Sequence, residues 1–328
     1  MSGSDEFGDI ARRFAPLSFG APEALGLLDD AAVIGARPGY DLVITQDALV
    51  EGVHFMPNER ADRVAQKLLR TNLSDLAAKG AQPYGCFLSI SWPSHYDDAA
   101  RDLFAAALKT DLAQYGLALF GGDTTATPGP LTASLTALGW VKAGSMVRRA
   151  GAKAGDLIFV SGTIGDAYLG LRLAMGEDLG LSATDQAFLL DRYHCPQPRL
   201  DLRSALLGHA KAAADVSDGL VADCGHIARA SGLGLTLELD KIPLSVAARR
   251  WIDSVADPAK ALLNLATGGD DYEIVCAVKL EAMLAFASAT EGLGTAMTTI
   301  GQFGAEPQLN VCFKGTAQSV AEAGYQHR

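Results

Sequence analysis

The chain has 328 residues and a formal net charge of −11, with 49% hydrophobic and 20% charged residues. This composition excludes a disordered chain, and the length suits two domains of ordinary size. No apolar run approaches the roughly 20 residues of a membrane helix, and no Lys/Arg run is long enough for a nucleic-acid-binding patch. We therefore expect neither a membrane nor nucleic acid as a partner. The polar N-terminus lacks a signal-peptide core, so we expect a cytoplasmic protein.

Strand-like and helix-like segments alternate along the chain. Helical periodicity runs through 60–80 and 95–116, each closing on a glycine. A further helix is expected after Ser217 and Asp218, ending near Gly232. The interleaving predicts an α/β or α+β fold. Apolar runs predict strands at 41–47, 84–92, 117–123, 131–141, 156–162, 233–239 and 272–278.

The segment 142–156 separates two halves of the chain. It is rich in glycine and basic residues and lacks apolar periodicity. We expect domains at 1–145 and 146–328, each long enough to form its own core.

Aspartates recur at predicted strand ends or beside glycine, where α/β folds build ligand sites. Carboxylates that meet in a cleft repel each other unless a cation lies between them. Hard oxygen donors favour Mg²⁺, which binds carboxylates together with substrate phosphates. The five cysteines form no C-x-x-C pair, which argues against a zinc site and a disulfide framework. The pattern comprises Asp29, Asp30, Asp47, Asp75, Asp123, Asp215, Asp218, Asp270 and Asp271.

Each motif also has a structural interpretation. Ser217 or Asp218 is expected to cap the helix that follows, and Asp223 is interpreted as an ordinary residue of that helix. The "FGGDTT" stretch (120–125) allows close backbone approach to a nucleotide, and "VSGTIGDAYLG" (160–170) is either an anion site at a helix start or a plain turn. P-loop, dinucleotide-binding and protein-kinase motifs do not occur, so any ATP binds in another way.

Several of these stretches, taken in order, resemble the thiamine-monophosphate kinase family of the aminoimidazole-ribonucleotide-synthetase-like superfamily of ATP-binding proteins. The matching segments cover nearly the whole chain. They are "DDAAV", "TQDALVEGVHF", "NLSDLAAKGAQP", "FGGDTT", "RRAGAKAGD", "VSGTIGDA", "DVSDGL", "GGDDYE" and "AGYQH".

The resemblance implies transfer of the ATP γ-phosphate to thiamine monophosphate, the last step of thiamine diphosphate biosynthesis. It implies an N-terminal mixed sheet with helices that dimerises and binds ATP and several Mg²⁺ ions. A C-terminal α/β sandwich would complete the nucleotide and substrate site. The implied partners are thiamine monophosphate, ATP and a second copy of the chain.

Site residues carry over from this family by motif. The implied metal ligands are Asp30, Thr45, Gln46, Asp47, Asp75, Asp123, Asp215 and Asp218. The implied nucleotide contacts are Gly122, Asp123, Arg149 and Ser217, and the implied substrate contacts are His54, Asp270 and Tyr325. Asp218 and Arg149 are the implied catalytic residues.

The chain departs from the family pattern at four positions. Leu28 replaces a glycine, Gln46 replaces a small hydroxyl residue, Asp270 stands where Glu is also common, and Arg328 ends the chain in place of an aromatic residue. Another ATP-using member of the superfamily, a Mg²⁺-dependent phosphohydrolase and a non-catalytic nucleotide-binding module are the alternative interpretations.

Overall fold

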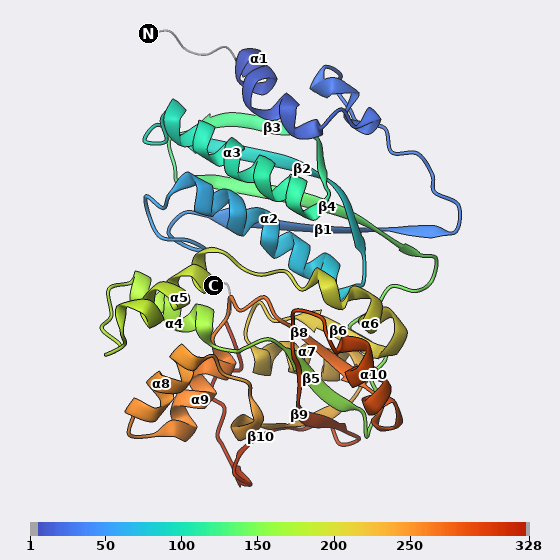
Figure 1. Ribbon diagram of the computed structural model, residues 1–328, viewed down its shortest axis with the longest axis vertical. Helices are drawn as coiled ribbons and strands as arrows, with labels where there is room; N and C mark the ends of the chain where they lie inside the picture. The colour runs from blue at the N-terminus through green and yellow to red at the C-terminus, as the bar shows by residue number, and fades with distance from the viewer. Residues whose placement is uncertain (1–5, 326–328) are drawn as a thin grey trace. The chain divides into compact units, whose positions relative to one another are not determined.

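The computed structural model describes residues 6–325, which form two compact units (Figure 1). The first unit contains the chain up to Leu76 together with Ala81–Gly144. The second contains Ala77–Gly80 and the chain from Ser145 onward. No helix within residues 6–325 combines the length and the hydropathy needed to cross a bilayer.

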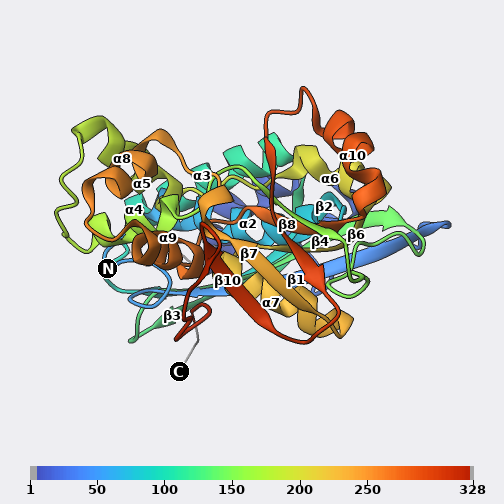
Figure 2. The same cartoon turned by 90° about the horizontal axis from the view of Figure 1, so that it is seen from below.

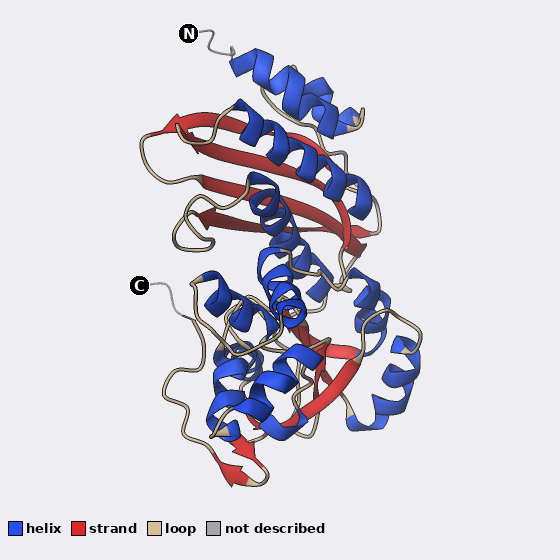
Figure 3. Ribbon diagram, turned by 60° about the vertical axis from the view of Figure 1, so that its left-hand side comes forward, coloured by secondary structure: helices blue, strands red, loops and turns tan. Residues whose placement is uncertain are grey.

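The first unit is built on a four-stranded mixed sheet with the strand order β1-β4-β2-β3. Strands β2 and β3 are parallel, and the other neighbours are antiparallel. Helices α2 and α3 lie on one face of this sheet (Figure 3). The elements are α1 (Glu6–Asp9), β1 (Tyr40–Val50), α2 (Ala61–Ala78), β2 (Gln82–Pro93), α3 (Asp98–Tyr115), β3 (Ala118–Thr127) and β4 (Thr132–Lys142).

Short helical turns precede β1 and pack beside the sheet. They comprise a π-helical turn (Ile10–Phe14) and two 3₁₀ segments (Ala15–Ser18 and Pro22–Leu27). The buried Arg13 guanidinium anchors them by donating to Asp102 at 2.6 Å and to Asp98 at 2.9 Å, both on α3. These ion pairs thereby hold the turns in place beside strand β3.

The second unit holds a seven-stranded sheet with the order β11-β10-β7-β9-β5-β8-β6, in which only the pair β10–β7 is parallel among the described strands. Helix α7 lies beside β7 (Figure 2). The strands are β5 (Leu157–Ser161), β6 (Ala210–Asp215), β7 (Gly234–Glu238), β8 (Ile274–Val278), β9 (Met297–Gly304), β10 (Leu309–Phe313) and β11 (Thr316–Ala317). The helices are α4 (Asp166–Ala174), α5 (Ala183–His194), α6 (Arg203–His209), α7 (Leu220–Ser231), α8 (Val246–Ser254), α9 (Pro258–Thr267) and α10 (Met283–Thr290).

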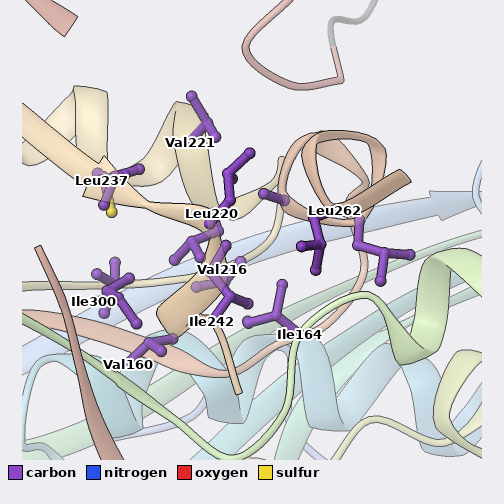
Figure 4. Packing of buried hydrophobic residues seen from close by; sticks show 14 of the residues in the cluster. Val160, Ile164, Val216, Leu220, Val221, Leu237, Ile242, Leu262 and Ile300 are labelled. Atoms are coloured by element: carbon purple, nitrogen blue, oxygen red, sulfur yellow. The ribbon is translucent and has the colours of Figure 1, made fainter. Parts of the chain in front are cut away.

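The core of the second unit fixes both ends of the loop between β6 and α7. Val216 and Leu220 are fully buried and pack with Ile164 and Ile242 in one cluster (Figure 4). Residues 217–219 therefore connect two residues, Val216 and Leu220, that are held in place by the packed core.

The mixed α/β architecture with two domains is confirmed, and each predicted strand overlaps an observed one whose ends differ by at most four residues. Strands β6, β9, β10 and β11 were not predicted. Strand β6 consists largely of alanine, which carries little strand propensity, and its pairing with β8 determines its conformation.

Candidate active site

A cavity of about 330 Å³ lies in the first unit between the N-terminal helical turns and strands β2 and β3. Asp29 and Asp30 line it on one side, and Gly122 and Asp123 line it on the other. Aromatic and aliphatic side chains, among them Phe87, form the rest of its wall. The structure therefore brings Asp30, Gly122 and Asp123 together around one apolar cavity with an acidic rim.

Two backbone features shape this cavity. Gly122 has φ 153°, and a Cβ there would lie 1.8 Å from the carbonyl oxygen of Leu88, so the approach of β2 itself requires glycine. Leu28 has φ −110°, an ordinary value, whereas the positive φ values fall at Leu25, Gly26 and Leu27. The sequence departure at Leu28 therefore introduces no backbone strain before Asp30.

A second group joins β1 to α2. The Thr45 hydroxyl donates to an Asp75 carboxylate oxygen at 2.5 Å, and the backbone N–H of Asp47 donates to the Asn72 side-chain oxygen at 3.1 Å. Burial raises the pKa of Asp47 to about 6, and the neighbouring negative charge of Asp75 adds to the shift. Thr45, Asp47 and Asp75 thus form a cluster that disfavours its own negative charge and would gain from a bound cation.

Gln46 faces the opposite side of the sheet, as the alternation of a strand requires. Its amide nitrogen donates to Ser134 Oγ at 3.0 Å. The strand register aligns Ser134 with Ser89 on β2 and Ser89 with Asp123 on β3. The predicted ligands of the first unit therefore divide between the two faces of the sheet.

His54 lies in the turn after β1. Its Nδ1 accepts the backbone N–H of Val50 at 3.0 Å, which places the proton of the neutral ring on Nε2. The buried Lys67 ammonium donates to the His54 carbonyl oxygen at 3.0 Å. The turn that presents this imidazole is thus tied to α2.

The β6–α7 loop gathers the predicted residues of the second unit. Asp215 ends β6 and is buried, and Ser217 and Asp218 follow it. The Ser217 carbonyl oxygen accepts the N–H of Asp270 at 2.9 Å, and the Asp218 carbonyl oxygen accepts the N–H of Tyr325 at 2.9 Å. These backbone hydrogen bonds place the Asp270 and Tyr325 segments directly against the loop.

The predicted helix cap is wrong. Helix α7 begins after Gly219, and neither Ser217 nor Asp218 caps it with a side chain. Instead, Asp223 Oδ2 accepts the N–H groups of Ser217 at 3.1 Å and Asp218 at 3.2 Å. A carboxylate of the helix therefore accepts hydrogen bonds from the loop, whereas the sequence predicted that a side chain of the loop would cap the helix.

Asp223 is also not the ordinary helix residue that we expected. It is fully buried, and burial followed by the charge of Asp218 raises its pKa to about 7, against a smaller opposite effect of Arg149. The sequence signal was weak, because an aspartate five residues after Asp218 matches no capping box. Arg149 is exposed, and its charge also lowers the pKa of His226, after the larger effect of burial.

The segment around Asp270 is strained and tightly enclosed. Asp270 has φ 72°, Tyr272 has φ 50°, and a Cβ on Gly269 would lie 2.6 Å from the Ser217 carbonyl oxygen. The neighbouring Asp271 carboxylate accepts the N–H groups of Gly165 and Ala167 at the start of α4. At 160–170, where an anion site was one of two interpretations, the N–H groups of the helix start are thus occupied by the protein's own carboxylate.

The site residues therefore form three groups, two in the first unit and one in the second. The first unit contributes the cavity rim and the β1–α2 cluster, and the second contributes the loop 215–218 with Arg149, Asp270 and Tyr325. Gln326, His327 and Arg328, including the departure at the terminus, lie outside the described residues.

Comparison with known proteins identifies the family. The family model "AIR synthase related protein, N-terminal domain" matches residues 28–141, and the corresponding C-terminal model matches residues 153–313. Thiamine-monophosphate kinase of Caulobacter vibrioides is 50% identical over 322 residues, which cover 98% of this chain and 90% of that protein.

Solved structures agree with the sequence comparison. Thiamine-monophosphate kinase from Stenotrophomonas maltophilia K279a has a TM-score of 0.83 at 36% identity, over 96% of this chain and 98% of that one. The structure of AaThiL complexed with AMPPCP and TMP has a TM-score of 0.78 at 28% identity, over 90% and 89% of the two chains. The chain belongs to the thiamine-monophosphate kinase family, which has the two-domain AIR synthase related architecture.

Proposed function

We propose that this chain transfers the γ-phosphate of ATP to the phosphate of thiamine monophosphate, forming thiamine diphosphate and ADP. The observation that carries the assignment is the cavity lined by Asp30 together with Gly122 and Asp123 of strand β3. Its apolar wall suits a nucleobase or other flat group, and its acidic rim suits phosphates that arrive with cations. AaThiL, a relative with the same architecture, was solved with AMPPCP and TMP bound.

The described carboxylates fit Mg²⁺. Asp47 and Asp75 are close enough for one charge to raise the other's pKa, and all the assigned donors are oxygen atoms. We assign Asp30, Thr45, Gln46, Asp47, Asp75, Asp123, Asp215 and Asp218 as the ligands of several Mg²⁺ ions, since these residues lie on two faces of the first sheet and in two units. Gln46 would contribute its backbone oxygen, since its side chain is directed to Ser134. When bound, Mg²⁺ supplies neutralisation of the charge shared by the two phosphates.

The chain's own residues then position two phosphates for in-line transfer. The acceptor is a phosphate oxygen that is largely ionised at neutral pH, because its second pKa is about 6, so no strong general base is needed. Arg149 and Ser217 would hold the nucleotide, and the exposed guanidinium of Arg149 can stabilise charge on the transferring group. His54, Asp270 and Tyr325 would contact thiamine monophosphate, the aromatic ring facing its cationic heterocycle.

The test is a coupled product assay with the full chain, ATP, Mg²⁺ and thiamine monophosphate. Thiamine diphosphate should form in step with ADP. Asp218→Asn should lower turnover by about 100-fold or more at unchanged thermal stability, because the loop is held by backbone hydrogen bonds that the substitution leaves intact. Near-normal turnover would refute the role of Asp218.

The same assay separates the alternatives. ADP release that ignores thiamine monophosphate would indicate a phosphohydrolase or another ATP-using member of the superfamily. Binding of ATP without any product would indicate a nucleotide-binding module. Neither alternative is favoured by the relatives named above.

Two further assignments complete the proposal. The first unit would bind ATP and Mg²⁺ and form a homodimer, while the second would complete nucleotide and substrate binding. A cytoplasmic location is supported by Cys86, Cys224, Cys276 and Cys312, which are free thiols, as expected in a reducing compartment.

A further inference from the structure

Three side chains of the second unit converge beside the β6–α7 loop. Asp218 lies on the loop, Asp223 lies one turn into α7, and His226 follows three residues later. One potential ligand atom from each side chain lies within 4.8 Å of the other two. Helical spacing explains the pair in α7, because residues three apart share one face.

The two oxygens of Asp223 have different environments. Oδ2 accepts the two N–H groups of the loop. Oδ1 is buried and has no hydrogen-bond partner among residues 6–325, and the imidazole nitrogen Nδ1 of His226 lies 3.8 Å from it. A buried acceptor without a partner is destabilising, so native proteins rarely retain one without a ligand, water or ion.

The groups around Asp223 Oδ1 favour a cation over other ligands. Oδ1 points toward an imidazole nitrogen and stands close to a second carboxylate, Asp218, so an anion would be repelled. The charge of Arg149 also acts on Asp223, yet no hydrogen bond joins Arg149 to Oδ1 within the described chain. The His226 side chain is 31% exposed, which leaves a route from solvent.

We propose that Asp218, Asp223 and His226 form a site for a divalent first-row transition ion such as Mn²⁺. Two carboxylates with one imidazole suit Mn²⁺, Fe²⁺ or Zn²⁺ better than Mg²⁺, which prefers oxygen donors alone. The site rests on the proposed metal role of Asp218 and adds two ligands that the family resemblance did not supply. Asp223 would then bind the loop through one oxygen and the ion through the other.

The test uses Mn²⁺ and the full chain without nucleotide or thiamine monophosphate. Pulsed electron paramagnetic resonance detects a histidine nitrogen bound to Mn²⁺ through its nuclear modulation of the echo. We expect this nitrogen signal in the wild type and its loss in His226→Gln. His95→Gln, at an exposed histidine of the first unit, is the matched control and should keep the signal.

Asp223→Asn separates ligation from support of the loop. Its side-chain oxygen can still accept both loop N–H groups, whereas its NH₂ group would occupy the position of the ion. We expect at least tenfold weaker Mn²⁺ binding at this site, with melting temperature preserved. A wild type without nitrogen modulation, or a signal that persists in His226→Gln, would overturn the proposal.

These measurements do not depend on kinase activity. Loss of thiamine diphosphate formation in the wild type would refute the proposed function and leave the Mn²⁺ readout intact. A normal kinase without the nitrogen signal would refute the metal site alone.

Discussion

Asp47 carries a charge that the folded chain opposes. Its pKa is raised from 3.8 to about 6, so the folded state keeps a proton that the unfolded state releases. The stabilisation from this proton is fully present below about pH 4 and is lost as the pH rises through about 6. At neutral pH the ionised Asp47 beside Asp75 is therefore a local source of instability unless a cation is present.

We predict that Mg²⁺ stabilises the protein more at about pH 7.5 than at about pH 5. In metal-free buffer, the free energy of unfolding should fall by about 1 kcal/mol between these values because of Asp47, allowing for its partial exposure. Denaturant unfolding with and without Mg²⁺ measures this difference. Asp47→Asn should flatten both dependences, and an unchanged pH profile in that variant would exclude the explanation.

Single residues also show where sequence reasoning stopped. The sequence shows which motif each aspartate belongs to, but it does not predict which residue each aspartate contacts. Asp223 was passed over because its contacts are with loop N–H groups that have no sequence signature. Conversely, glycine at 122 was explained by nucleotide approach, whereas the adjacent strand already requires it.

At the scale of elements, strand β8 begins at a buried ionic junction. Glu273 is fully buried and accepts hydrogen bonds from Arg192 of α5 at 2.9 Å, from Arg199 at 2.7 Å and from Ser161 of β5 at 2.6 Å. It directly follows the strained segment that carries Asp270. The junction therefore ties α5 and β5 to the backbone that supports the substrate contact.

Glu273→Gln should lower the free energy of unfolding by about 3–5 kcal/mol, because it leaves two arginines without their buried counter-charge. Glu177→Gln is the control, since Glu177 is exposed to solvent and its pair with Arg172 should contribute far less to the free energy of unfolding. Equilibrium denaturation of both variants gives the comparison. Similar losses in the two would show that burial does not set the strength of the junction.

Element prediction succeeded where periodicity was long and failed where tertiary pairing decided. Helices α2 and α3 were predicted to within three residues of their observed ends because each has an apolar face and a closing glycine. Strand β6 was missed because "AKAAAD" resembles a helix by propensity, and only the neighbouring β8 makes it extended. The loop after it could not be predicted for the same reason.

At the scale of the molecule, helices α2 and α3 lie on one face of the first sheet, and the second face is directed away from these helices. Ile44 projects from this face and is 60% exposed, on the strand whose alternate residues Thr45 and Asp47 interact with α2. A single exposed apolar residue is common on protein surfaces, but on a sheet face a second copy of the chain could cover it and pair like elements across a two-fold axis. This supports the proposed homodimer.

Ile44→Asp should convert a dimer into a monomer of 34.2 kDa, because it places a charge in the proposed interface. Light scattering coupled to size-exclusion chromatography measures the mass. Leu284→Asp is the control, since this residue is also apolar and is 77% exposed but lies in the second unit. A wild type that elutes as a monomer would contradict the dimer directly.

Residues Ala77–Gly80 belong to the second unit although they end a helix that begins in the first. Lys79 donates to the Ala213 carbonyl oxygen at 2.8 Å, and its own carbonyl oxygen accepts the N–H of Val147 at 3.3 Å. The two units are consequently not divided at a single point of the chain. A chimera that took all residues after 145 from a distant relative would receive most of the second unit from that relative. It would keep the original residues Ala77–Gly80, which belong to the same unit. These four residues would then contact a strand β6 with which they did not evolve.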